Sequence, residues 1–263
     1  MKPSATGRDD VATLAALGVI VACVSAAGHE AFGHGGACLL AGGEVTLLTA
    51  TRFACDGGAL WVDAAGPAMN LLLAVVSLWL LRRASAKAVA WRWLLFLMAA
   101  VNIAWFAGEV ISSPFVPGYD EAAIASQLGW SPTVWQPTML IGGVLVYAVG
   151  IRMMAAAAWR QRDRGDPADR LRSRFAIPFA AAALSFTLAG TLRPGSPIAG
   201  AVECFLTIGV AALPMWLVTG PASRATAAAD AKPVQRSIGW IALAAIVYAM
   251  FLLFQARGIG RLA

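Results

Sequence analysis

The chain has 263 residues, of which 59% are hydrophobic and 13% are charged, and its mean hydropathy is +0.71. This composition excludes a soluble globular domain and is typical of a protein that crosses a membrane several times. The net charge of +6 does not indicate nucleic-acid binding, because the basic residues cluster between apolar stretches.

Several apolar stretches approach or exceed the roughly 20 residues that a membrane-spanning helix needs. They are residues 11–40, 64–81, 91–111, 137–158, 175–193, 197–219 and 238–256. We therefore predict an all-α polytopic membrane protein with about six or seven transmembrane helices.

The basic residues fall in alternate connections between these stretches, as the positive-inside rule expects of cytoplasmic segments. The three groups are Arg82, Arg83 and Lys87; Arg160, Arg162, Arg164, Arg170, Arg172 and Arg174; and Arg224, Lys232 and Arg236. Lys2 and Arg8 place the N-terminus on the same, cytoplasmic side. The connections that follow the first and third stretches are then expected to be extracytoplasmic.

The two histidines of the chain, His29 and His34, lie within six residues of each other, with Glu30 between them, inside the first apolar stretch. Titratable side chains are costly in a membrane. Imidazole and carboxylate suit zinc, and a bound ion offsets the cost of burying them. The segment therefore predicts a metal site; the alternative is a glycine-rich buried helix whose polar groups hydrogen-bond to neighbours.

The spacing of the two histidines differs from the familiar His-Glu-x-x-His motif, whose ligands share one helix face. In a regular α-helix, side chains five residues apart point about 140° apart. A π-bulge, with its hydrogen bonds from residue i to i+5, would return both histidines to one face, and such bulges tend to occur at functional sites. The glycines Gly28, Gly33, Gly35 and Gly36 favour this local departure from a regular helix.

Residues 42–62 are too short and too polar to span a membrane. We predict two strands, residues 45–53 and 59–62, around a turn at residues 56–58. Irregular backbone at membrane depth must be buried by protein or face water. The hairpin is therefore expected to line a wet site beside the His-Glu helix.

The four cysteines, Cys23, Cys38, Cys55 and Cys204, contain no C-x-x-C pair. This spacing indicates neither a zinc ribbon nor a disulfide framework. We expect all four to serve as small apolar packing residues.

A zinc site built on two histidines usually recruits a third protein ligand, often a carboxylate. Asp120 follows a segment of helix breakers after the third stretch, so it can point back into the bundle. Glu109, Glu121 and Asp63 are alternatives, and Asp120 can also be read as a solvated loop acid. Two other polar residues lie within apolar stretches, and each has a structural and a functional interpretation: they are Asn70 and Glu203.

Three motifs, in this order, resemble the site-2 protease family of intramembrane zinc metalloproteases. The first is the His-Glu segment at 29–34. The second, Ala-Gly-Pro-Ala-Met-Asn at 65–70, resembles the family's Gly-Pro-x-x-Asn segment. The third is Asn102 followed by Pro-Phe-Val-Pro-Gly-Tyr-Asp at 114–120, which resembles less closely the stretch that supplies the family's third ligand. The predicted hairpin also fits the family's membrane-embedded β element.

The chain departs from the family pattern at three points. The His-Glu motif has one extra residue, which leaves open whether His29 or Glu30 fills the place of the first ligand. A soluble dipeptidyl-peptidase family does use a His-Glu-x-x-x-His zinc motif. Glu121 stands where the family usually has glycine, and the charge bias places the site on the extracytoplasmic side.

The resemblance implies that His29, His34 and Asp120 hold Zn²⁺, with a water in the fourth position whose proton passes to Glu30. It implies catalytic support from Asn70, and substrate binding by Asn102 and by the segment that holds Gly66 and Pro67. The expected function is a zinc-dependent intramembrane endopeptidase that cleaves membrane-spanning segments. The alternatives are a non-proteolytic metal-binding protein of the same fold and a small transporter with a His/Glu ion path.

The resemblance divides the chain into a catalytic membrane core over residues 1–121 and additional transmembrane helices over residues 122–263. The expected partners are a substrate helix and the lipid bilayer, without nucleic acid. We expect the protein in the bacterial inner membrane. Its oligomeric state, substrate and pathway do not follow from the sequence.

Overall fold

The computed structural model describes residues 8–57, 59–116, 118–163, 168–213 and 232–260. Some of the predicted features extend beyond these ranges. They are residues 214–219 of the sixth apolar stretch, Gly58 in the expected hairpin turn, Pro117 in the third motif, and the basic residues Lys2, Arg164 and Arg224.

The secondary structure is dominated by helices, three of which continue into π-helical segments that are labelled η. In chain order the elements discussed below are α1 (Val11–Ala26), η1 (Ala27–Gly35), α2 (Gly36–Leu40), β1 (Glu44–Leu48), β2 (Phe53–Asp56), α3 (Leu60–Arg83), α4 (Val89–Ser112), α5 (Asp120–Gln127), α6 (Pro132–Asp163), α7 (Ala168–Gly190), α8 (Pro197–Cys204), η2 (Phe205–Val210), α9 (Ile238–Phe251), η4 (Leu252–Ala256) and β3 (Ile259–Gly260).

The predicted helical class is confirmed, and within the described ranges six helical segments are long and apolar enough to cross a membrane. These segments are Val11–Leu40, Leu60–Arg83, Val89–Ser112, Pro132–Arg160, Leu171–Gly190 and Ile238–Ala256. The described part of the predicted stretch 197–219 differs from the prediction, because it contains a shorter apolar helix, Pro197–Val210.

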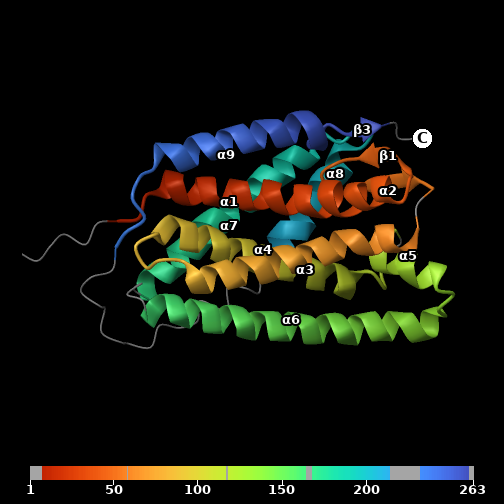
Figure 1. Ribbon diagram of the computed structural model, residues 1–263, viewed down its shortest axis with the longest axis horizontal. Helices are drawn as coiled ribbons and strands as arrows, with labels where there is room; N and C mark the ends of the chain where they lie inside the picture. Colours follow the sequence, from red (N-terminus) through yellow and green to blue (C-terminus); the bar gives the residue numbers. More distant parts are fainter. Residues whose placement is uncertain (1–7, 58, 117, 164–167, 214–231, 261–263) are drawn as a thin grey trace, which may run out of the picture.

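The long helices run along the long axis of the molecule (Figure 1). Helix α1 packs against α7, α9 and α4, and α4 packs in turn against α3 and α6. Because α4 lies among these helices, most of its side chains are buried, including Trp93 and Trp105. The outer faces of α6 and α9 expose large apolar side chains such as Ile141, Leu145 and Ile246. Such faces suit contact with lipid tails, which are as apolar as leucine.

The predicted hairpin is present between α2 and α3, but its turn is elsewhere. Strands β1 and β2 pair antiparallel, with Leu48 opposite Phe53. The chain reverses at residues 49–52, where the Thr49 amide donates to the Arg52 carbonyl at 2.8 Å. The expected turn at residues 56–58 is therefore wrong, because a local backbone hydrogen bond closes a turn that contains no glycine.

The predicted second strand at residues 59–62 is also wrong, because α3 begins at Leu60. Gly57, with a φ of +79°, directs the chain out of β2 toward this helix, a conformation that costs glycine little. A third strand completes the sheet in the order β2-β1-β3, and it comes from the C-terminal end of the described chain. Pairing of Leu48 with Ile259 thus joins the hairpin to the far end of the sequence.

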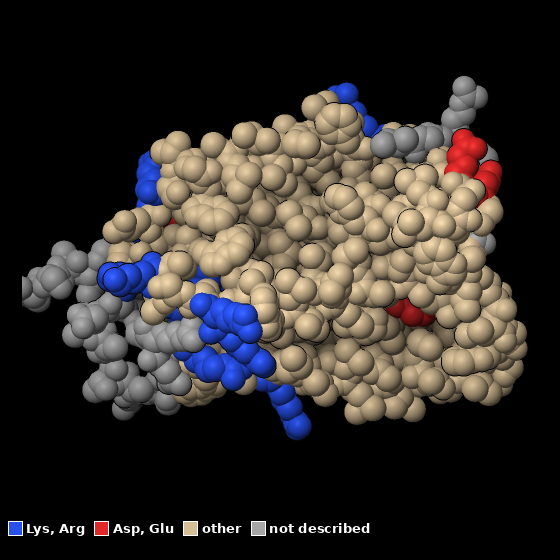
Figure 2. All heavy atoms as spheres, viewed as in Figure 1, with Lys and Arg blue, Asp and Glu red and all other residues tan. Residues whose placement is uncertain are grey.

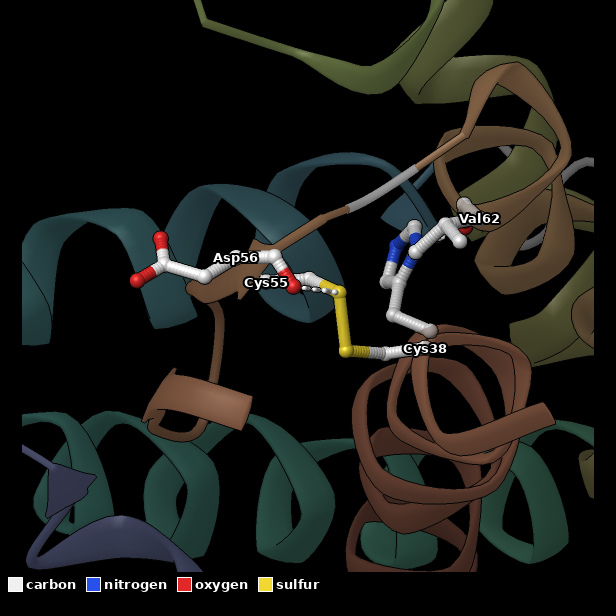
Figure 3. The surroundings of a disulfide bond; sticks show 5 residues. Cys38, Cys55, Asp56 and Val62 are labelled. Atoms are coloured by element: carbon white, nitrogen blue, oxygen red, sulfur yellow. Dashed lines mark hydrogen bonds between the residues drawn. A yellow bond between two sulfur atoms is a disulfide. The ribbon is translucent and has the colours of Figure 1, made fainter. Parts of the chain in front are cut away.

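A disulfide links Cys38 of α2 to Cys55 of β2, across 17 residues, with a Cα–Cα distance of 6.0 Å (Figure 3). The prediction of four packing cysteines is therefore wrong for this pair, because the fold brings α2 and β2 together. Cys23 and Cys204 are free and buried, as predicted. The disulfide fixes the hairpin to the end of the first long helix.

The two ends of the bundle differ in charge. Figure 2 shows most of the visible Lys and Arg side chains gathered at the end near the start of α1, and Asp and Glu side chains near the opposite end. At the basic end, the fully buried Arg174 guanidinium donates to both carboxylate oxygens of Asp9 at 2.8 Å and to the Lys232 carbonyl at 2.8 Å. The same carboxylate accepts a 2.6 Å hydrogen bond from the Val234 amide.

Candidate metal centre

His29, Glu30 and His34 all lie in the π-helical segment η1, and all three are buried. The prediction that a π-type segment would bring both histidines to one face is confirmed. The two rings meet edge to face, with centroids 4.9 Å apart. The π-helical turn thus lets two histidines five residues apart share a face, as two histidines four residues apart do in an α-helix.

Helix α3 approaches η1 so closely that the contact requires glycine on both sides. A Cβ on Gly33 would lie 2.8 Å from the Gly66 Cα, and a Cβ on Gly66 would overlap the His34 ring. Gly66, which the resemblance assigned to substrate binding, therefore lies directly against a candidate ligand. Pro67 follows it, buried inside α3.

Three potential ligand atoms converge at one point. His29 Nε2 and His34 Nε2 are 3.2 Å apart, and Asp120 Oδ2 lies 3.3 Å from the first and 3.0 Å from the second. Two ligands about 2.0–2.1 Å from a tetrahedral zinc ion lie about 3.3–3.4 Å from each other. The separations among these three side chains therefore fit a zinc ion without rearrangement of the backbone.

The surroundings of His34 leave its Nε2 free to bind a metal. Its Nδ1 lies 2.7 Å from the Val62 carbonyl oxygen, which can accept the Nδ1–H group, so Nε2 is the ring nitrogen that faces His29 and Asp120. Phe53 of β2 stacks on the ring with a centroid distance of 5.3 Å. The hairpin thus orients a ligand through an aromatic contact.

His29 is held by Trp105, which stacks on its ring at a centroid distance of 5.0 Å, and by Asn70. The Asn70 Nδ2 lies 3.0 Å from His29 Nδ1, while Asn70 Oδ1 has no partner in the described part of the chain. Rotation of this amide by 180° would let Oδ1 accept the Nδ1–H of a metal-bound imidazole, as metal-ligating histidines require. The donor set and this unpartnered oxygen both fit zinc.

A cavity of about 100 Å³ opens beside the three ligand atoms, with room for a few water molecules. Its lining is mostly polar and combines the long helices with the hairpin. The lining residues include His29, Glu30, His34, Asp63, Glu109 and Asp120 from the helices, and Thr51, Arg52 and Phe53 from the hairpin. Glu30 therefore faces the space in which a water or substrate would approach the metal.

Several carboxylates surround Asp120. Burial by itself raises the pKa of Asp120, but the hydrogen bonds with His29 and His34 outweigh burial and hold that pKa below its usual value. Burial raises the pKa of Glu121 to about 7. Glu109 Oε1 lies 3.9 Å from His29 Nε2, farther than Asp120, and Asp63 reaches only the cavity wall.

Two other predicted residues lie elsewhere. Asn102 is fully buried between α4 and α1, where its Nδ2 donates to the Ser25 hydroxyl and the Met98 carbonyl, both at 2.8 Å. It is not among the residues that line the described cavity. Glu203 lies at the cavity wall, where it accepts hydrogen bonds from Thr51, Arg52 and Arg193. Sequence reasoning missed the stacking of Phe53 and Trp105 on the histidines and the pairing of Arg52 with Glu203, since nothing local to these residues indicates such contacts.

No family model, curated protein or solved structure matches this chain.

Proposed function

We propose that this chain is a zinc-dependent intramembrane endopeptidase. The observation that carries the proposal is the convergence of His29, His34 and Asp120 within 4.8 Å of one another, beside Glu30, inside a bundle of apolar helices. Buried ionisable groups in such a bundle are expensive unless an ion or a function uses them.

In this proposal His29, His34 and Asp120 hold the zinc ion. A zinc ion held there would polarise the scissile carbonyl group and lower the pKa of a water molecule, so that the water could lose a proton and act as the nucleophile. Glu30 accepts the proton of the attacking water as general base and delivers it to the leaving amine. Asn70 orients His29 rather than touching substrate, because it is fully buried and its amide faces the imidazole.

The substrate class follows from the location of the cavity. Part of its wall, including His29, Asp63 and Glu109, belongs to helices that are apolar enough to lie in a membrane, so a membrane-spanning segment is the peptide that we expect to reach it. Such a segment must unwind locally before cleavage, because its helical carbonyls are already hydrogen-bonded. The hairpin beside the cavity offers a strand edge with which the unwound segment can pair.

Two observations support an extracytoplasmic site. The Cys38–Cys55 disulfide lies at the same end of the bundle as the ligand cluster, and disulfides persist in oxidising compartments. The basic residues that the positive-inside rule assigns to the cytoplasm gather at the opposite end (Figure 2). Both support a location of the cluster on the side away from the cytoplasm.

The decisive experiment measures zinc content by elemental mass spectrometry in detergent-purified protein, for wild type, His34→Ala and Glu30→Gln. We expect near-stoichiometric zinc in wild type and Glu30→Gln, and its loss in His34→Ala. Cleavage of a membrane-spanning reporter in proteoliposomes should be lost in both variants, because one lacks a ligand and the other lacks the base.

Other outcomes favour other functions. Wild type that neither carries nor takes up zinc contradicts the proposal, and pH-dependent ion flux in the same vesicles would then favour the transporter. Zinc that is retained without cleavage of any membrane-spanning reporter would favour a non-proteolytic metal-binding protein.

A further inference from the structure

A second cavity, of about 360 Å³, lies next to the metal centre and is bounded by α4, α6 and η2. It shares Trp105, Glu109, Tyr119 and Thr207 with the cavity of the metal centre. The two spaces are therefore neighbours with a common wall. A volume of this size lies within the range of about 300–1,000 Å³ that is typical of ligand pockets.

The second cavity is chemically different from the first. Four side chains with hydroxyl groups border it. Three of them donate to backbone carbonyls: Ser112 to Gly108 at 2.6 Å, Thr207 to Glu203 at 2.9 Å, and Tyr147 to Ala211. The fourth, Tyr119, lies in the wall that the two cavities share. The remaining lining is mostly aliphatic, so the far part of this cavity offers an apolar surface. The polar part, at Glu109, adjoins His29.

We infer that this cavity is a specificity subsite, which binds a large apolar side chain, of leucine size or larger, next to the peptide bond that is cleaved. The inference rests on the proposed protease function. A peptide bound at the metal centre would place its polar backbone in the first cavity, and the side chain next to the cleaved bond would need a separate space. A polar cavity that continues into a larger apolar one matches both parts of such a residue, and membrane-spanning segments are rich in large apolar side chains.

Two substitutions change the size of the subsite in opposite directions. Val210 lines it from η2 and is 45% exposed, so Val210→Phe should fill the cavity without disturbing the core. Ile111 lines it from α4, and Ile111→Ala should enlarge it. Val202→Phe is the matched control, since Val202 lies on the preceding helix α8, is 50% exposed and lies outside the lining of this cavity.

The test uses binding rather than cleavage. The probes are hydroxamates of alanine, leucine, phenylalanine and tryptophan, whose common group binds zinc and whose side chains differ. Their affinities are measured on purified, zinc-loaded protein. In wild type and in Val202→Phe, we expect the affinities of the leucine and phenylalanine compounds to be at least about tenfold higher than that of the alanine compound. Val210→Phe should abolish this preference, and Ile111→Ala should shift it toward tryptophan.

Four results would overturn the inference. Equal affinities for all four probes would remove the subsite while leaving the zinc site and the proposed function in place. A preference that Val210→Phe and Ile111→Ala leave unchanged would place the side chain elsewhere. Affinities that depend on the acyl-chain length of added lipid, and not on the probe's side chain, would make the cavity a lipid site. Zinc-loaded protein that binds no hydroxamate would contradict both the subsite and the protease.

Discussion

A buried cluster of ionisable side chains lies at each end of the first long helix. The two clusters differ in how many of their polar atoms have hydrogen-bond partners. At its start, Asp9 and Arg174 form two hydrogen bonds to each other, and backbone groups complete the set. At its far end, His29, His34 and Asp120 face one point, and in the described residues Glu109 Oε2 and both Glu121 carboxylate oxygens have no hydrogen-bond partner.

We interpret this difference as one between a structural cluster and the proposed metal site. A buried ion pair whose donors and acceptors are all used gains nothing from a ligand. A cluster that gathers several carboxylates around two imidazoles offers the ligand types that a divalent cation such as zinc binds. The unpaired groups at one end of α1 therefore support the proposed metal site, and the paired groups at the other end are what a purely structural ion pair requires.

The largest effect should come from the third ligand. Asp120→Asn should weaken zinc binding by about a thousandfold or more, because a structural zinc site draws about 10–16 kcal/mol from its ligands together. Glu109→Gln is the control and should keep its zinc, because Glu109 is farther from His29 than Asp120 is. Competition with a chelator measures both affinities. The reverse pattern would make Glu109 the ligand.

At the paired end, Asp9→Ala should lower the free energy of unfolding by about 3–5 kcal/mol, because it leaves the Arg174 charge buried and uncompensated. Zinc content should not change. The neighbouring Asp10 caps α1 by accepting the Thr13 amide at 2.8 Å, and Asp10→Ala should destabilise the protein less than Asp9→Ala, because it leaves no buried charge unpaired. Denaturation in mixed micelles compares the two variants. An equal loss of unfolding free energy in the two variants would show that the pairing of Asp9 with Arg174 does not stabilise the fold.

The disulfide connects the hairpin to α2, which directly follows the segment that holds His29 and His34. Cys38→Ser with Cys55→Ser should lower the free energy of unfolding by about 3 kcal/mol, the value expected for a closed loop of this length. A reducing agent should lower the melting temperature of wild type and of the control Cys204→Ala, and should leave the double variant unchanged. A wild-type melting temperature that reductant does not affect would contradict the stabilising role.

The smallest effect concerns the support of His29. Asn70→Ala should weaken zinc binding about 10- to 100-fold, the usual cost of removing a residue that orients a ligand. Asn102→Ala is matched in residue type and burial but contacts Ser25 and Met98, so its zinc affinity should equal that of wild type. Chelator competition again gives the comparison. Equal losses in both variants would mean that general packing, not the His29 contact, sets the affinity.

The sequence predicts the features that depend on rare residues in an apolar chain. His29 and His34 are conspicuous there, and the glycines around them favour the π-type segment that is observed. Asp120 lies 86 residues from His34, yet it stands out because it follows a run of helix breakers that lets it point back into the bundle. The structure brings these residues together, although their roles as ligands stay a prediction.

Other features depend on tertiary contacts that have no local signal. The hairpin turn at residues 49–52 contains no glycine or proline, so turn chemistry points instead to residues 56–58. The pairing of Cys38 with Cys55 follows from the approach of α2 to β2. The partner of His34 Nδ1 is a backbone carbonyl, at Val62, and backbone groups are identical in every sequence.

The π-helical segment also changes how a gain of one residue propagates along the chain. In an α-helix, an inserted residue rotates everything that follows by about 100°. The wider turns of η1 take up the additional residue locally, so that α2 continues the helix and Cys38 still meets Cys55. A one-residue change in motif spacing therefore need not separate two ligands in a membrane helix. Searches for such motifs should allow both the four-residue and the five-residue register.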